Sequence, residues 1–146
     1  MFDLDAYLAV KIPVTQAMGI RFGGRDRSGF ALVAPLRLNL NDKGSAFAGS
    51  LATLATLCGW AYTQTLINDA GVDAEVVVAR STLHYLRPGR GDLRAHCAAP
   101  ESVAVESFLS SLRARGRARW SLQVELRSGA ELVLQFQGYY RATLRR

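Results

Sequence analysis

Residues 44–68 read GSAFAGSLATLATLCGWAYTQTLIN, and none of these side chains carries a charge. The run has the length of a membrane span, but its many hydroxyl, amide and glycine residues make it too polar for one. A helix over residues 47–67 that is apolar nearly all round fits the pattern, and such a helix is buried nearly all round. At 1.5 Å per residue it would be ~30 Å long, the width of a small domain. We therefore expect the rest of the chain to wrap around it.

The whole chain has the size and composition of one folded domain. It has 146 residues, of which 49% are hydrophobic and 21% are charged, and a chain of this length buries about 70% of its unfolded surface. No repeat or polar linker divides it, so we expect a single domain over residues 1–146. The acidic, amphipathic start lacks a basic segment followed by an apolar run, which argues against a signal peptide.

Alternating apolar residues predict strands on both sides of the helix. Two short strands are expected between residues 19 and 36, with a turn at Ser28-Gly29. Four more follow, in AEVVVARSTLHYLRP, DLRAHCA, RWSLQVELR and ELVLQFQGYYRATL. The first of these four is expected to place Val77, Ala79, Ser81, Leu83 and Tyr85 on one face. The order predicts an α+β fold, in which one curved antiparallel sheet wraps around the helix.

Two shorter segments complete the expected fold. Asp3 can cap a short first helix, which Pro13 ends. Residues 100–116 are expected to form a short helix or an irregular crossover between two strands.

The two cysteines, Cys58 and Cys97, lie in apolar surroundings without CxxC or Cys–His spacing. This pattern excludes a zinc knuckle and a disulfide scaffold, and it fits a reducing compartment. We therefore expect a cytoplasmic protein without a bound metal, in which Cys58 is a small core residue.

The net charge of +6 comes almost entirely from arginine, since Lys11 and Lys43 are the only lysines. Guanidinium groups favour partners that carry phosphate or carboxylate groups. In an extended segment, Arg113, Arg115, Arg117 and Arg119 would all point the same way. Such a row favours a counter-charge, either the phosphates of coenzyme A or a nucleic acid, and a solvated rim is the simpler alternative. No nucleic-acid-reading motif accompanies the arginines, so we expect no nucleic-acid partner.

Two motifs resemble a known family. In LNLNDKGSAFAGSLATLATLCGW (residues 38–60), Asn41, the Lys43-Gly44 step and Phe47-Ala48-Gly49-Ser50 match a loop and helix start, and YLRPGRGD (residues 85–92) matches a strand-turn-strand. The chain resembles the hot-dog fold putative thioesterase family that is related to the C-terminal half of certain bacterial acetyltransferases. The resemblance implies a homodimer or homotetramer with acyl-thioester sites between subunits. It implies acyl-CoA or acyl-carrier substrates, no membrane partner, and no cofactor apart from the coenzyme A of the substrate.

Thioester hydrolysis places negative charge on the carbonyl oxygen, and free N–H groups at a helix N-terminus can stabilise that charge. Small residues let a substrate approach the backbone closely. We therefore expect the N–H of Ala48 or Gly49 to bind the oxyanion. The alternative is that these small residues only let the sheet pack tightly against the helix.

Further polar side chains are candidates for the site. Asn41 can orient water or hold the carbonyl, or it can be a turn residue that bonds its own backbone. The other expected substrate contacts are Lys43, Gly44, Phe47, Ser50, Arg87 and Arg90. Thr56 stands where many hot-dog thioesterases carry a carboxylate, and Ser81 is the polar residue on an apolar strand face.

A threonine is a poor base, so the usual mechanism of the family is in doubt. Asp42 and Glu106 are the carboxylates that could substitute, and the sequence does not rank them. His84 and His96 have no nucleophile at triad spacing. A thioesterase is the function we expect, and a non-catalytic acyl-CoA-binding domain is the alternative.

Overall fold

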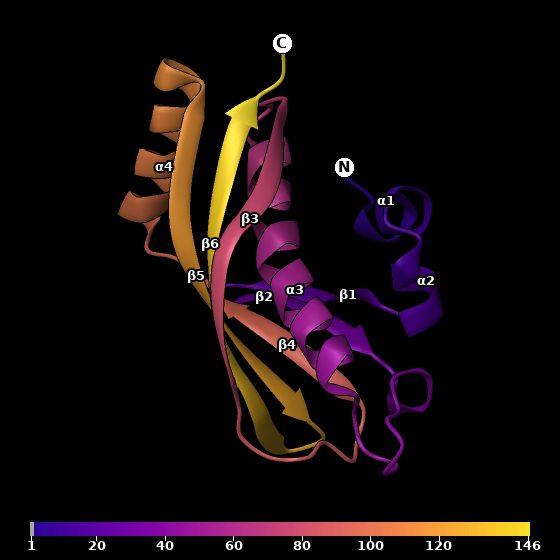
Figure 1. The fold of residues 1–146 in the computed structure, drawn as a ribbon. Coiled ribbons are helices and arrows are strands. Elements are labelled where there is room, and N and C mark those ends of the chain that lie inside the picture. Colours follow the sequence, from indigo (N-terminus) through magenta and orange to yellow (C-terminus); the bar gives the residue numbers. More distant parts are fainter. Residues whose placement is uncertain (1) are drawn as a thin grey trace.

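In the computed structural model, which describes residues 2–146, six strands form one curved sheet around a long helix (Figure 1). The helical elements are α1 (Leu4–Lys11), α2 (Val14–Met18), the 3-10 turn η1 (Leu36–Leu38), α3 (Ala48–Asp69) and α4 (Ser102–Arg115). The strands are β1 (Arg21–Asp26), β2 (Gly29–Ala34), β3 (Ala74–Tyr85), β4 (Leu93–Ala98), β5 (Arg117–Ser128) and β6 (Glu131–Leu144). The α+β class and the helix wrapped by an antiparallel sheet, which are the hot-dog architecture, are confirmed.

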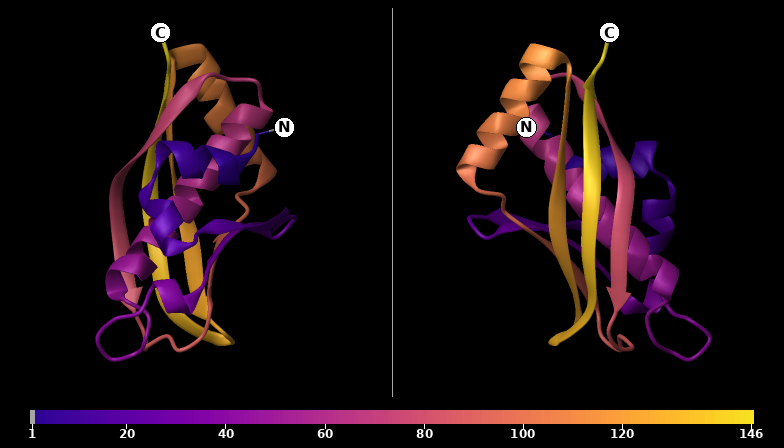
Figure 2. Two further views of the ribbon diagram at one scale, coloured as in Figure 1. Left: turned by 90° about the vertical axis from the view of Figure 1, so that its right-hand side faces the viewer. Right: turned by 60° about the vertical axis from the view of Figure 1, so that its left-hand side comes forward.

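The strand order is β1-β2-β4-β5-β6-β3, and all neighbouring strands are antiparallel. β3 therefore lies at one edge of the sheet, beside α3 (Figure 1). The longest strands, β5, β6 and β3, lie on one side of α3, and α1 and α2 lie on the other side (Figure 2). This arrangement leaves the outer edge of β3 without a strand partner in the single chain.

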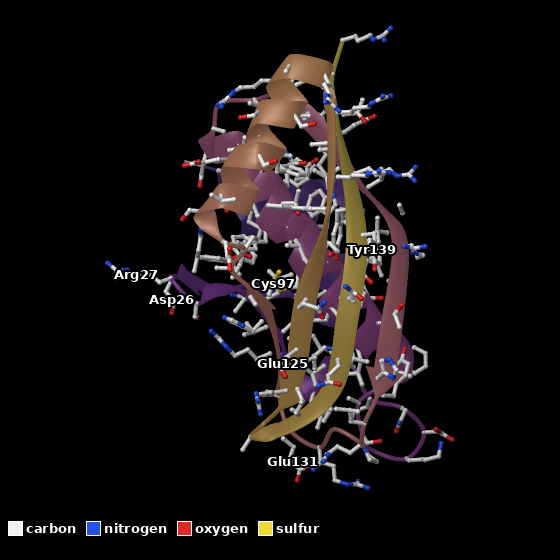
Figure 3. The ribbon with its side chains drawn as sticks, turned by 90° about the vertical axis from the view of Figure 1, so that its left-hand side faces the viewer. Asp26, Arg27, Cys97, Glu125, Glu131 and Tyr139 are labelled. Atoms are coloured by element: carbon white, nitrogen blue, oxygen red, sulfur yellow. The ribbon has the colours of Figure 1, made fainter. Side chains whose placement is uncertain are left out.

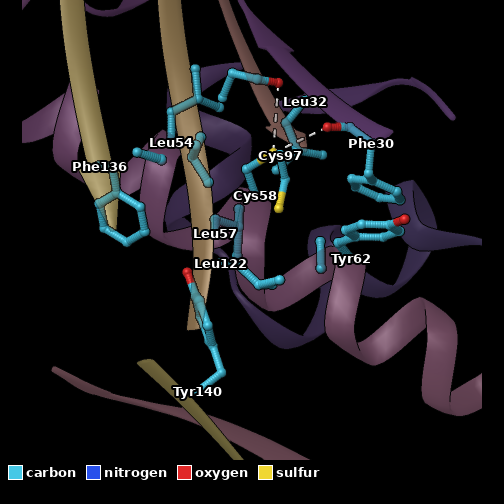
Figure 4. Packing of buried hydrophobic residues seen from close by; sticks show 14 of the residues in the cluster. Phe30, Leu32, Leu54, Leu57, Cys58, Tyr62, Cys97, Leu122, Phe136 and Tyr140 are labelled. Carbon is cyan, nitrogen blue, oxygen red and sulfur yellow. Dashed lines mark hydrogen bonds between the residues drawn. The ribbon is translucent and has the colours of Figure 1, made fainter. Parts of the chain in front are cut away.

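The core lies between α3 and the inner face of the sheet. On β5 the expected alternation is confirmed, because Leu122, Val124 and Leu126 are buried. Cys58 is buried too, and its thiol donates to the carbonyl oxygens of Phe30 and Ala95 at 3.6 Å (Figure 4). Burial raises the pKa of Cys58 to about 12, so its thiol stays protonated and unreactive at neutral pH.

Gly59 lets the sheet approach α3 closely. The buried ring of Tyr140 packs over it, and a Cβ at Gly59 would lie only 2.6 Å from Cζ of that ring. Tyr140 then donates from its hydroxyl to the carbonyl oxygen of Thr56 at 2.7 Å. The contact fixes the middle of α3 against β6.

A β-bulge between Val78 and Arg80 corrects the expected facing of β3. Val76 pairs with the buried Ala142 before the bulge, whereas Leu83 pairs with the buried Phe136 after it. The face that packs on α3 therefore changes from even to odd residues. The sequence pattern placed Val77 on the inner face, and this is wrong because Val77 precedes the bulge and is 55% exposed.

The crossover is a regular helix, α4, that continues to Arg115 and ends at Gly116, whose φ is 75°. The expectation that four alternating arginines point the same way is therefore wrong. Arg113 lies on α4 and donates to the carbonyl oxygen of Ala70, at the end of α3, at 2.9 Å. Arg117 and Arg119 belong to β5.

The N-terminal segment covers α3. Asp3 caps α1 as expected, since its carboxylate accepts the Ala6 N–H at 3.1 Å. The first helix ends just before Pro13 as expected, and Pro13 is in addition the N-cap of the short second helix α2. No helix within residues 2–146 has the length and apolar character that crossing a bilayer requires.

Candidate active site

One side of α3 is not covered by the rest of the chain, which corrects the expectation that the helix is buried nearly all round. Gly49, Ala52, Thr53, Thr56 and Trp60 are all half-buried, and their spacing of three or four residues puts them on one helix face. A groove of about 370 Å³ runs along this face, lined by Ile12, Ala52, Thr53, Thr56, Leu57, Trp60 and Val78. A long, mostly apolar hollow beside β3 is therefore available to a ligand.

Free backbone N–H groups lie at the beginning of α3. Phe47, the N-cap, donates its N–H to the Asn39 carbonyl oxygen at 2.7 Å, and Leu51 donates to Phe47 at 3.1 Å. Between them, the N–H groups of Ala48, Gly49 and Ser50 have no acceptor within residues 2–146, and no side chain caps the helix. The positive end of the helix dipole is thus open to a ligand oxygen.

Gly49 is not packed against the sheet. A Cβ at this position would overlap the ring of Phe47, nearest to its Cε2 atom and 3.0 Å from Cζ, and that ring is 52% exposed. The three atoms nearest to such a Cβ all belong to Phe47. Close packing of the sheet therefore explains the glycine at position 59 but not the one at position 49.

Asn41 holds the loop before α3 in shape. Its side-chain oxygen accepts the N–H groups of Lys43 at 2.8 Å and Ser45 at 3.0 Å, and its amide donates to Ser45 Oγ at 2.9 Å. These bonds support the turn-residue alternative. Lys43 is exposed and pairs with the neighbouring Asp42 at 3.0 Å. This pair occupies the loop surface.

Sequence reasoning overlooked Asn39. Its side chain is buried and donates to the carbonyl oxygens of Met18 at 2.9 Å and Pro35 at 2.8 Å, while its backbone holds Phe47. Asn39 thereby ties the start of α3 to the end of α2. The repeated asparagine in LNLN was the available signal, but the sequence alone does not say which of the two points inward.

The YLRPGRGD segment reaches the same end of α3. The carbonyl oxygen of Gly89 accepts the Ala46 N–H at 2.8 Å, and the Tyr85 hydroxyl donates to the Ala48 carbonyl oxygen at 3.4 Å. Arg87 and Arg90 flank Gly89 and are exposed, with Arg87 3.9 Å from Glu131. The structure thus brings these two arginines to the end of the molecule where α3 begins.

Thr56 contributes a hydroxyl to the groove. It lies about two turns after Ala48, ~12 Å along the helix. Thr53, one turn before it, donates its own hydroxyl back to the Gly49 carbonyl oxygen at 2.8 Å. Ser81 is exposed and lies on the side of β3 that faces α3, but it is not among the residues that line the groove. The structure therefore places Thr56 in the groove and Ser81 outside it.

The carboxylates and histidines lie elsewhere. No Asp or Glu is among the groove residues. Glu106 is on α4, and this helix occupies the upper half of the view in Figure 1, whereas α3 begins near the bottom. His84 and His96 line a separate hollow on the outer face of the sheet. Among residues 2–146, no carboxylate or imidazole lines the groove to act as a general base there.

Comparison with known proteins gives one family. The family model described as Putative thioesterase (yiiD_Cterm) matches residues 1–144. A solved protein of unknown function from Chlorobaculum tepidum is 27% identical, with a TM-score of 0.91 over 96% of this chain and 91% of that one. A putative thioesterase from Shewanella oneidensis is 29% identical, with a TM-score of 0.85 over 96% and 94%. A probable thioesterase from Pseudomonas aeruginosa is 27% identical, with a TM-score of 0.81 over 99% and 97%.

Proposed function

Since this chain belongs to the putative thioesterase (yiiD_Cterm) family, we propose that it hydrolyses acyl thioesters of coenzyme A or of an acyl-carrier protein at the start of α3. The observation that carries the proposal is the set of uncapped N–H groups at Ala48, Gly49 and Ser50, which lie about one turn before Ala52, the first α3 residue that lines the apolar groove. The acyl chain lies in this groove, and its carbonyl oxygen points at the helix end.

The N–H groups supply the electrostatic part of catalysis. Water attacks the carbonyl carbon, and the oxygen gains the negative charge that the N–H groups of Ala48 and Gly49 bind. The carbon–sulfur bond then breaks, the thiolate leaves and takes a proton, and the carboxylic acid is released. Arg87 and Arg90 bind the phosphates of the substrate outside the groove.

The Thr56 hydroxyl, ~12 Å along α3 from Ala48, reaches the attacking water through one or more bridging waters and orients it, but does not deprotonate it. Tyr140, which bonds the Thr56 carbonyl oxygen, fixes this part of the helix. Without a carboxylate base in the groove, the rate depends on hydroxide, so kcat rises steadily with pH between about 7 and 9 rather than reaching a plateau.

A second copy of the chain completes the site. The free edge of β3 exposes Val77 and Val78, and Leu38, Phe47 and Tyr85 are large exposed residues around the start of α3. An open strand edge beside an apolar surface favours pairing with another strand. In the proposed homodimer, the β3 strands of two copies pair and the partner covers the open side of the groove.

The alternative is an acyl-CoA-binding domain without activity, which the absence of a carboxylate in the groove favours. Release of free thiol from a panel of acyl-CoAs separates the two functions. The purified protein suits this assay because its own thiols, Cys58 and Cys97, are buried and their pKa values are raised by that burial. Tight binding without thiol release would refute the enzymatic proposal and support the alternative.

A further inference from the structure

A basic hollow lies on the outer face of the sheet, across β3 from the groove: Val78 lines the groove, whereas Ala79 and Arg80 line the hollow. Arg119 of β5 and Arg141 of β6 are paired directly across the two strands, and both are exposed. Both side chains line two adjoining hollows of about 680 and 630 Å³. One hollow is bounded by α4, and the other extends to Arg80 at the bulge of β3. Further residues of the two hollows are Ser107, Ser111, Arg115, Arg117, Tyr139 and Thr143.

The charges in this basic hollow are not neutralised by the chain. Like charges directly opposite one another destabilise a sheet, unless a counter-charge is present. None of the ion pairs formed between residues 2 and 146 includes an arginine of the hollow. Glu75 is the carboxylate that the register brings nearest, and it stands opposite Thr143. In Figure 3, Glu125 and Glu131 lie lower than Tyr139, toward the turn between β5 and β6.

One guanidinium group of the hollow is held in place, and so is the beginning of the strand that carries Arg119. The Arg80 guanidinium lies over the Tyr139 ring, 4.4 Å from its centroid, which fixes a cation flat on the sheet. Ser111 donates to the Arg117 carbonyl oxygen at 2.9 Å and so fixes the beginning of β5 beside α4. Planar guanidinium groups suit phosphate oxygens, and concave sites of this volume suit small ligands rather than a flat protein surface.

The hollow is not an extension of the thioester groove. Leu134 pairs with Tyr85 near the start of α3, and Arg141 lies seven residues further along β6, ~23 Å away at ~3.3 Å per residue. Arg141 also points to the outer face, whereas the groove lies on the inner side with α3. Because Arg141 is this far from the proposed oxyanion site and lies on the opposite face of the sheet, we assign a phosphate bound at Arg141 to a second ligand rather than to a thioester in the groove.

We propose that the basic hollow around Arg119 and Arg141 binds a small ligand with two or more phosphate groups, such as a nucleoside diphosphate or triphosphate. Isothermal titration calorimetry of the full chain with inorganic pyrophosphate and with ATP tests this. We expect both ligands to bind. If ATP binds more tightly than pyrophosphate, the natural ligand is a nucleotide; if the two affinities are equal, the hollow recognises the phosphate groups alone.

Two double variants with the same change in net charge decide whether binding is local. R119Q/R141Q weakens binding of both ligands at least tenfold, while R94Q/R127Q, which removes the other cross-strand arginine pair of this sheet, changes it less than threefold. R141Q alone serves if the first double variant does not fold. Thiol release by R119Q/R141Q stays at the wild-type rate, which separates this site from the thioester site.

Three results would overturn the proposal. Pyrophosphate and ATP fail to bind at low salt, or both double variants weaken binding equally, or a generic DNA duplex binds more tightly than ATP. The second result would show an effect of net charge alone, and the third would assign the surface to nucleic acid.

Discussion

Replacing Gly49 and Gly59 by alanine, one at a time, separates the two roles that small residues have on α3. In Gly59→Ala the new methyl group overlaps the buried Tyr140 ring, whereas in Gly49→Ala it meets only the exposed ring of Phe47. The chemical change is identical and both positions are on the same helix. Any difference between the variants therefore reflects their surroundings.

The magnitudes follow from these contacts. Overpacking a core costs ~1–3 kcal/mol, and alanine returns ~1 kcal/mol of helix propensity. Because the overlap at Gly59 is with a fully buried ring, we expect a net loss of about 1–2 kcal/mol, a decrease in Tm of roughly 3–6 °C for a chain of this length. Gly49→Ala keeps its Tm or raises it slightly, since Phe47 can turn away into solvent.

Activity shows the opposite pattern. In Gly49→Ala the methyl group occupies the space beside the free N–H groups, so kcat/KM for thioester hydrolysis decreases at least tenfold, ~1.4 kcal/mol of transition-state stabilisation. Gly59→Ala retains kcat/KM within threefold below its Tm. Thermal unfolding followed by circular dichroism, together with the thiol-release assay, measures both effects. A Gly49→Ala variant of normal activity would refute the role of the helix start.

Three further predictions follow from the groove and the core. Thr56→Asp places a carboxylate in the groove that can deprotonate the attacking water through the bridging water, so kcat increases at least tenfold and its pH profile reaches a plateau; a lower kcat at every pH would contradict the role given to Thr56. Trp60 closes the far end of the groove, held by its Nε1–H donating to the Val76 carbonyl oxygen at 2.9 Å and by the stacked Tyr7 ring. Trp60→Ala therefore shifts the preferred acyl chain to longer lengths in a chain-length series, and an unchanged preference would show that the acyl group lies elsewhere. The pKa of Cys58 is about 12 in the folded protein, and its ordinary value, which applies to the unfolded chain, is 9. The contribution of the protonated thiol to the free energy of unfolding is therefore complete below pH 9 and is lost as the pH rises toward 12. Denaturant titrations between pH 8 and 10.5 show this as a decrease of up to ~1.4 kcal/mol per pH unit from Cys58, which Cys58→Ala removes.

The sequence predicted the fold well because its signals were local. The uncharged run predicted the central helix over residues 47–67, and the observed helix ends two residues later, at Asp69. Strict alternation of apolar and polar residues predicted β5. The bulge in β3 was not predictable in this way, because a bulge arises from pairing with β6, which is distant in sequence. The four arginines do not form a single row, because Gly116 separates the helix that carries Arg113 and Arg115 from the strand that follows. The small residues between the arginines suit a helix and a strand equally well, so the sequence did not show this division.

The candidate site was predictable only in part. The small residues at Ala48 and Gly49 marked the helix start, and the structure adds that their N–H groups are free. The open face of α3 was missed because an absence of charge does not distinguish a face buried in the core from one that a ligand or second subunit covers. The outer basic hollow was missed because Arg80, Arg119 and Arg141 come from three separate strands.

A crystal structure with a non-hydrolysable acyl-CoA analogue tests the central claim most directly. The account predicts the acyl carbonyl oxygen within hydrogen-bond distance of the Ala48 or Gly49 nitrogen, at about 3 Å, with the acyl chain along Thr56 toward Trp60. An analogue bound with its carbonyl group away from the start of α3, or with that end of the helix covered by the chain itself, would contradict it.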